Sequence, residues 1–200
     1  LTPEFVAAYK MGDVLGAGAM GMVFAAQQAS TGRPVAIKFL VGSDDVSAIE
    51  RFTAEGRLLA RLSHPAILRV YDSGVQSDCP YLVTDVLTGG SLRERLSRTK
   101  YIPISDAKEL TLRLLEGLQE CHENQILHRD LKPENVMFDG AGQPVIVDLG
   151  LGRLMTGSAG LTKTGALLGT PRYMAPEQWN SEVLGPATDL YAVGIMMFEM

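Results

Sequence analysis

His128-Arg129-Asp130-Leu131-Lys132-Pro133-Glu134-Asn135 is the most informative stretch of this 200-residue sequence. Asp130 and Asn135 lie five positions apart with Lys132 between them, so one short loop carries a carboxylate, an ammonium group and an amide. This set suits a base, a phosphate clamp and a metal ligand. The alternative is a charged surface turn, in which Asp and Asn serve only as turn-forming residues.

A second carboxylate follows eighteen residues after Asp130. Asp148 comes directly after the apolar run Val145-Ile146-Val147 and before Leu149-Gly150, which predicts an aspartate at the end of a strand. Mg²⁺ is typically held by one or two carboxylates together with substrate phosphates, so Asp148 and Asn135 form a plausible pair of ligands. Taken alone, Asp148 is also compatible with a turn-initiating aspartate before glycine.

A glycine-rich segment near the start of the chain suits phosphate binding. In residues 16–23, Gly-Ala-Gly-Ala-Met-Gly-Met-Val, glycine allows the backbone to approach phosphates without interference from side chains. An ordinary Gly/Ala turn is the alternative. A dinucleotide-binding loop requires a helix directly after the glycines, whereas the runs 23–26 and 35–40, broken at 30–34, predict a strand hairpin. A glycine loop between two strands fits better.

Lys38 lies on the expected strand 35–40, where its ammonium group can act as a point charge for nucleotide phosphates, although most strand lysines are solvated. Apolar residues at helical spacing predict a helix over 46–62. Glu55 lies one turn before Leu59 on the face expected to pack inward, so it is the preferred carboxylate partner of Lys38, with Glu50 as the competitor.

Further local patterns predict the remaining elements. Gly89-Gly90 is interpreted as a flexible crossing between two lobes. The other expected elements are strands over 67–71 and 81–86, a helix from its N-cap Ser105 to about Glu123, short strands and loops from Asn124, and a final helix over 189–200.

Composition excludes several classes of function. The net charge of −5 and pI near 5.2 provide no basic field for a nucleic acid. Cys79 and Cys121 lack a CxxC or metal-ligand spacing, which argues against a disulfide or zinc scaffold and favours a reducing, cytoplasmic setting. No leader and no membrane segment is recognised within residues 1–200, although an anchor outside them is compatible with the sequence.

Residues 169–177, Gly-Thr-Pro-Arg-Tyr-Met-Ala-Pro-Glu, complete a set of motifs that resembles the eukaryotic-like (Hanks-type) Ser/Thr protein kinases over nearly the whole chain. Gly-Ala-Met-Gly-Met-Val and Ala-Pro-Glu-Gln look closest to the bacterial branch. The resemblance implies an α+β, bilobal fold: a small antiparallel β-rich N-lobe with one helix and the hinge over 1–87, and an incomplete, mostly helical C-lobe over 88–200. Asp148-Leu149-Gly150 departs from the common Asp-Phe-Gly, but leucine keeps the apolar packing role of the middle residue.

The resemblance also assigns roles in the transfer of phosphate from ATP to Ser/Thr protein substrates. It implies that Asp130 is the base, that Lys132 stabilises the transferred group and that Thr170 helps to shape the site. Asn135 and Asp148 would hold Mg²⁺ or Mn²⁺. The residues implied to contact ATP are Gly16, Gly18 and Gly21 over its phosphates, Lys38 held by Glu55, Val23, Ala36 and Met137 around adenine, Thr84 as gatekeeper, and the backbones of Asp85 and Leu87.

Regulation is expected in the segment that follows Asp148. Phosphorylation of Thr162 or Thr164 could order this segment by docking on Arg129 and Arg153. The competing functions are a nucleotide-binding pseudokinase, a small-molecule kinase and a non-catalytic binding module. The filled charged positions argue against the pseudokinase, while the protein substrate and the oligomeric state stay open.

By the same resemblance, the domain is expected to continue past Met200. An arginine that would pair with Glu177 and the surfaces that would cover Tyr191, Ile195 and Phe198 are expected there. A chain that ends at residue 200 is therefore expected to aggregate or to be weakly active.

Overall fold

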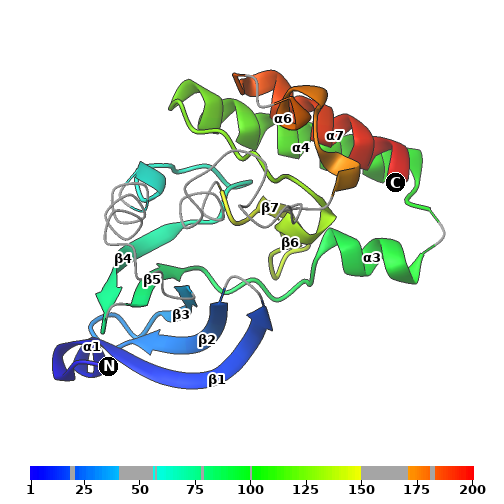
Figure 1. Ribbon diagram of the computed structural model, residues 1–200. Coiled ribbons are helices and arrows are strands. Elements are labelled where there is room, and N and C mark those ends of the chain that lie inside the picture. The colour runs from blue at the N-terminus through cyan, green and yellow to red at the C-terminus, as the bar shows by residue number, and fades with distance from the viewer. Residues whose placement is uncertain are drawn as a thin grey trace. The chain divides into compact units, whose positions relative to one another are not determined.

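The computed structural model describes residues 1–18, 21–40, 56, 58–77, 79–99, 101–149, 171–180 and 183–200 (Figure 1). They form two compact units, Leu1–Ser63 with Leu68–Val86 and His64–Ile67 with Leu87–Met200. The expected fold, an antiparallel sheet followed by helical segments, is confirmed. Residues 64–67 belong to the second unit, because Ile67 forms a β-bridge with Ile146 and the Ile146 N–H donates to the Ala66 carbonyl at 2.8 Å.

The first unit is built on a five-stranded antiparallel sheet. Its strands are β1 (Tyr9–Gly18), β2 (Gly21–Gln28), β3 (Pro34–Leu40), β4 (Val70–Gln76) and β5 (Cys79–Thr84), in the order β1-β2-β3-β5-β4. The predicted hairpin is confirmed, because β2 pairs with β3 and the Gln28 N–H closes the turn on the Arg33 carbonyl at 2.9 Å.

The two later strands of this sheet do not have the predicted bounds. The expected strand 67–71 begins only at Val70, because residues 66–67 pair with the second unit instead. The expected strand 81–86 is shifted to Cys79–Thr84. Of the expected helix 46–62, residues 56, 58 and 59 are described as helical, and Leu59 and Leu62 are buried.

A short helix that the sequence analysis did not predict, α1 (Pro3–Ala8), precedes the sheet. The Thr2 hydroxyl caps it by accepting from the Phe5 N–H at 3.4 Å, and Pro3 occupies the first helical position, where its missing N–H is not needed. The Phe5 ring, 4% exposed, lies 5.1 Å from the ring of Tyr9, 5.8 Å from Phe39 and 4.9 Å from Tyr81.

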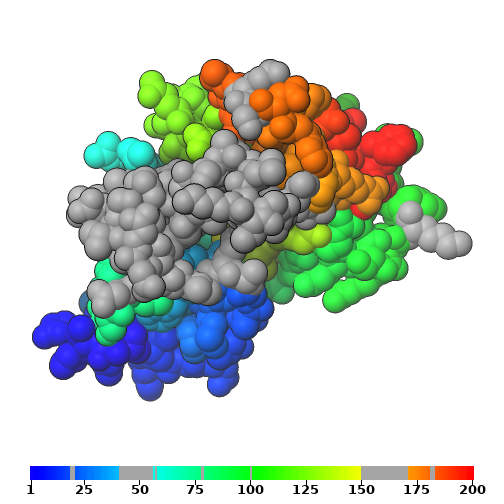
Figure 2. All heavy atoms as spheres, in the orientation of Figure 1, coloured from blue at the N-terminus to red at the C-terminus, as the bar shows by residue number. Residues whose placement is uncertain are grey.

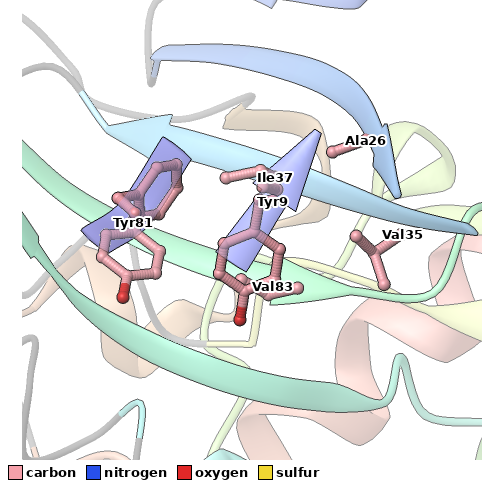
Figure 3. Packing of buried hydrophobic residues seen from close by; sticks show 7 residues of the cluster. Tyr9, Ala26, Val35, Ile37, Tyr81 and Val83 are labelled. Carbon is pink, nitrogen blue, oxygen red and sulfur yellow. The ribbon is translucent and has the colours of Figure 1, made fainter. Parts of the chain in front are cut away.

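This aromatic group belongs to the hydrophobic core of the first unit. The buried members of the core are Phe5, Tyr9, Ala26, Val35, Ile37, Tyr81 and Val83. Figure 3 shows side chains from β1, β2, β3 and β5 gathered in it. Because Ile37 lies directly before Lys38, the same core anchors the strand that presents the proposed phosphate-binding lysine.

We expect Phe5→Ala to lower the free energy of unfolding of this unit by about 3–5 kcal/mol, because it removes a buried ring and leaves a cavity between three aromatic side chains. Urea unfolding, followed by circular dichroism, measures the loss of stability. Val6→Ala is the matched control, since Val6 lies in the same helix and is 56% exposed. Equal stability of the two variants would show that α1 does not contribute to the core.

The second unit is mainly helical. Its elements are α3 (Leu92–Arg98), α4 (Ile104–Glu123), η1 (Pro133–Asn135), β6 (Val136–Phe138), β7 (Pro144–Ile146), η2 (Pro171–Tyr173), α6 (Pro176–Trp179) and α7 (Pro186–Glu199). Helix α4 buries Leu110, Leu114 and Leu118, and α7 packs beside it (Figure 1).

Two helix starts in this unit differ from the prediction. Pro103, not Ser105, is the N-cap of α4, and the Ser105 hydroxyl donates to Asp106 at 2.8 Å inside the first turn. The final helix begins at Pro186 rather than at residue 189, because proline is well suited to the first helical position.

The side chains of α7 divide into buried and exposed groups. Ala192, Val193 and Met196 are buried, whereas Tyr191 is 41% and Phe198 90% exposed. Ile195 is half-buried. None of the described helices is both long enough and apolar enough to cross a membrane.

Candidate active site

The structure brings Asp130, Lys132 and Asn135 together on one loop. The Lys132 Nζ lies 2.7 Å from Asp130 Oδ2, and Asn135 Nδ2 donates to the Asp130 carbonyl at 2.8 Å. Asn135 is buried, while 37% of the Asp130 side chain is exposed. The loop therefore holds a carboxylate in a fixed position and still presents it to solvent.

Val147, the residue before Asp148, is hydrogen-bonded to this loop through both its backbone N–H and its carbonyl group. The Val147 N–H donates to the Asn135 carbonyl at 3.0 Å, and the Val147 carbonyl accepts from His128 Nε2 at 3.0 Å. Strands β6 and β7 pair in antiparallel register just beyond these bonds. Asp148 has φ +59°, in the left-handed region, and these bonds fix the backbone that leads into it.

A buried aspartate that the sequence analysis missed supports the same loop. Asp189, 1% exposed, accepts from the His128 N–H at 2.9 Å, from the Arg129 N–H at 2.8 Å and from His122 Nε2 at 2.8 Å. Arg129 has φ +67°, so these bonds hold the residue before Asp130 in a left-handed conformation. Asp189 appears in sequence as an ordinary acid in the first turn of a helix, which hid its role.

The environment of Asp189 keeps it ionised. Burial alone would raise the pKa of its carboxyl group, but the hydrogen bond from His122, the nearby imidazole of His128 and the two backbone N–H donors outweigh burial and leave this pKa below its ordinary value. A buried carboxylate whose oxygens all accept hydrogen bonds supports a loop rigidly.

A second support comes from α6. Gln178 Nε2 donates to the Arg129 carbonyl at 2.8 Å, and Gln178 Oε1 accepts from the Ala175 N–H at 3.0 Å. The side chain of Arg129 is exposed. Glu177, for which an arginine partner was expected, accepts from the Thr188 hydroxyl at 2.7 Å.

The candidate nucleotide-binding residues of the first unit lie on paired strands. Lys38 is opposite Val23 on β2, and Ala36 is opposite Thr84 on β5. The Thr84 hydroxyl, which is buried, lies 3.2 Å from the carbonyl of Asp85. Leu87 and Met137, in contrast, belong to the second unit.

The three glycines of the loop differ in their surroundings. Gly21 has φ +135°, and a Cβ there would lie 1.9 Å from the Phe39 carbonyl oxygen, so the pairing of β2 with β3 requires glycine at this position. A Cβ at Gly16 or Gly18 would meet no described atom within 4 Å. The described packing of the sheet therefore does not require glycine at positions 16 and 18.

Five predicted site residues lie outside the described part of the chain. They are Glu55, Arg153, Thr162, Thr164 and Thr170. Their predicted roles stay predictions.

The donor groups at the loop fit a magnesium or manganese ion. Because Asn135 Nδ2 donates to the Asp130 carbonyl, the side-chain oxygen of Asn135 is the atom left to face a cation, and Asp148 adds a carboxylate. Oxygen ligands are those that Mg²⁺ prefers. In the part of the chain that the structure describes, no group of three or more His, Cys, Asp or Glu side chains could hold a metal.

Comparison with known proteins found a matching family model and several curated relatives. Residues 9–200 match the family model described as the protein kinase domain. The chain is 38% identical over 200 residues to a probable serine/threonine-protein kinase of Streptomyces coelicolor, which covers 96% of this chain and 30% of the relative. It is 32% identical to serine/threonine-protein kinase PknB of Mycobacterium leprae (99% and 33% covered) and 32% identical to serine/threonine-protein kinase PrkC of Bacillus subtilis (96% and 30%). The chain thus spans about a third of the length of these relatives.

Proposed function

This chain belongs to the protein kinase domain family, and from that premise we propose that it transfers the γ-phosphoryl group of ATP to Ser or Thr hydroxyls of protein substrates. The observation that carries the proposal is the loop on which Asp130, Lys132 and Asn135 are held within hydrogen-bonding distance of one another. Phosphoryl transfer requires alignment and neutralisation of charge more than a covalent step by the protein, and this loop supplies both.

Each side chain of the loop has a separate task in this proposal. Asp130 orients the substrate hydroxyl and accepts its proton, because its carboxylate reaches solvent while its backbone carbonyl is bonded to Asn135. Lys132, which lies against Asp130, places a positive charge where the phosphoryl group passes. Asn135 and Asp148 hold the cation, Mg²⁺ or Mn²⁺, which neutralises the phosphates of ATP when it is bound.

The nucleotide would be held mainly by the residues that the family resemblance assigns. Gly16, Gly18 and Gly21 cover its phosphates, and Lys38, supported by Glu55, contacts them. The same resemblance assigns contacts with adenine to Val23, Ala36 and Met137, to Thr84 as gatekeeper and to the backbones of Asp85 and Leu87, and it assigns to Thr170 a part in shaping the site. We place this activity in the cytoplasm, where ATP is available.

Regulation by phosphorylation belongs to the same proposal. A phosphate on Thr162 or Thr164 would form charge-assisted hydrogen bonds with Arg129 and Arg153 and so order the segment 148–177. The exposed side chain of Arg129 is available for this contact.

We expect the protein to label a degenerate Ser/Thr peptide mixture when it is incubated with Mg²⁺ and γ-labelled ATP, and we expect EDTA to abolish the labelling, because the phosphates would lose their cation. Asp148→Asn should lower the rate at least about 10²-fold. Mass spectrometry of the peptides identifies the modified hydroxyls. Wild-type protein that binds ATP but labels no peptide would contradict the proposal.

A further inference from the structure

A group of charged side chains lies beside the catalytic loop and is not used in the mechanism above. The guanidinium group of Arg93, on α3, is its centre: Nε lies 2.9 Å from Glu134 Oε1 and Nη1 2.8 Å from Glu199 Oε1. Its Nη2 donates to the Tyr173 hydroxyl, and that hydroxyl donates to Glu199. Arg172 adds an outer ion pair with Glu199 at 3.2 Å.

This cluster joins four elements of the second unit that are far apart in sequence. Arg93 comes from α3, Glu134 from η1, Tyr173 from η2 and Glu199 from the end of α7. Figure 2 shows the orange and red atoms of η2 and α7 next to the green atoms of α3. The guanidinium group carries five N–H donors in a planar, fixed arrangement, so an arginine can bridge three such partners at once.

The inner part of the cluster is shielded from solvent. The side chain of Glu199 is 13% exposed and Tyr173 4%, whereas Arg172 is 59% exposed. The hydrogen bond from Arg93 is the main reason that the pKa of Glu199 lies below its ordinary value. Burial and the hydrogen bond to Glu199 raise the pKa of Tyr173 to about 12, so its hydroxyl keeps its proton at neutral pH. The contacts among Arg93, Tyr173 and Glu199 are thus maintained over the physiological range. The more exposed contacts, of Arg172 with Glu199 and of Arg93 with Glu134, whose side chain is 42% exposed, are weakened by water and salt.

The cluster connects directly to the residues that surround Asp130. Glu134 immediately precedes Asn135, which donates to the Asp130 carbonyl. Tyr173 lies in the segment 171–178, in which Gln178 donates to the Arg129 carbonyl. The segment 171–178 therefore contacts the catalytic loop on both sides of Asp130: through Gln178 before it, and through Arg93 and Glu134 after it.

We propose that Arg93 is a positioning residue for the peptide substrate: it fixes the turn at Tyr173 against Glu134, so that the surface beside Asp130 keeps one geometry. This inference rests on the proposed protein kinase activity. Without Arg93, Glu134 and Glu199 would lose the positive charge between them, and the turn would lose its bond to α3. A substrate hydroxyl would then be presented to Asp130 less often in a reactive orientation.

Steady-state kinetics with two synthetic serine peptides test this, one with neutral and one with lysine-rich flanks. Arg93→Ala should lower kcat/KM for both peptides at least about tenfold and leave the affinity for ATP within about twofold. Tyr173→Phe keeps the packed ring and loses only the hydroxyl, so it should fold normally and lower kcat/KM about threefold or more. The double variant should lose less than the product of the two effects, because both changes disrupt one network.

Arg98→Ala is the matched control, since Arg98 lies on the same helix and is exposed. Some results would overturn the role of Arg93 without touching the proposed function. The first is that Arg93→Ala and Tyr173→Phe both show the same kinetics as Arg98→Ala. The second is a gain in kcat/KM confined to the lysine-rich peptide, which would show that Arg93 masks an acidic binding site instead. A fall in ATP affinity parallel to the fall in kcat/KM would also overturn it. If the wild type binds ATP but phosphorylates neither these peptides nor the degenerate mixture, the proposed function itself is wrong.

Discussion

Asp130→Asn should slow phosphoryl transfer by at least about 10²- to 10⁴-fold, the range lost with a positioned base. The amide cannot accept the proton of the substrate hydroxyl. Its NH₂ group would also face Lys132 Nζ, which lies 2.7 Å from Asp130 Oδ2. Affinity for ATP should change little, because Asp130 is assigned to the hydroxyl and not to the nucleotide.

Single-turnover rates with saturating ATP measure this loss separately from nucleotide binding. Asp106→Asn is a suitable control, because it makes the same chemical change on the exposed first turn of α4. A variant at position 130 that keeps a tenth or more of the wild-type rate would exclude Asp130 as the base. Alignment and charge neutralisation by the remaining residues would then have to explain the whole rate.

Asp189→Asn should destabilise the protein by about 3–5 kcal/mol at neutral pH, the range found when one partner of a buried ionic network is removed. An asparagine can still accept one bond, but its NH₂ group would face a backbone N–H of His128 or Arg129. We also expect a lower kcat, because the left-handed conformation of Arg129, directly before Asp130, would lose its support.

The effect of this substitution should depend on pH in a defined direction. The pKa of Asp189 is lower in the folded protein than its ordinary value, so its contribution is fully present above the unfolded pKa of about 3.9 and is lost as the pH falls through the folded pKa. In urea unfolding at a series of pH values, the free energies of unfolding of the wild type and the variant should converge as the pH falls. Asp13→Asn, on the exposed part of β1, should leave the dependence of the free energy of unfolding on acidic pH unchanged. A constant difference across all pH values would contradict this account.

The proximity of Asp130, Lys132 and Asn135 could be predicted from the sequence because all three lie within eight consecutive residues. The same holds for the hairpin of β2 and β3, whose apolar runs and intervening turn are local patterns. The roles of Asp189 and Arg93 could not be found in this way. Asp189 bonds to residues about 60 positions earlier, and Arg93 meets Glu199 106 positions later, so only the folded chain brings these partners together.

The errors in the element bounds have a similar origin. Ile67 is apolar and strand-like, but its bridge to Ile146 places it in the second unit rather than in the sheet of the first. Helix α1 was missed because a six-residue helix has weak periodicity, and Phe5 needs the distant Tyr81 ring to be buried. Ser105 is a good capping residue in general, yet Pro103 two residues earlier already starts the helix.

Gly16, Gly18 and Gly21 belong to one motif, but we expect them to differ in how readily they are replaced during evolution. A descendant that lost the need to bind phosphate could replace Gly16 and Gly18 freely, because no described atom opposes a side chain there. Gly21 would persist in that descendant for as long as β2 and β3 pair, since its φ of +135° and the neighbouring Phe39 carbonyl exclude any side chain. Retention of Gly21 alone would therefore follow from the pairing of the strands, whereas retention of all three would be expected only if the proposed contact with phosphate is still used.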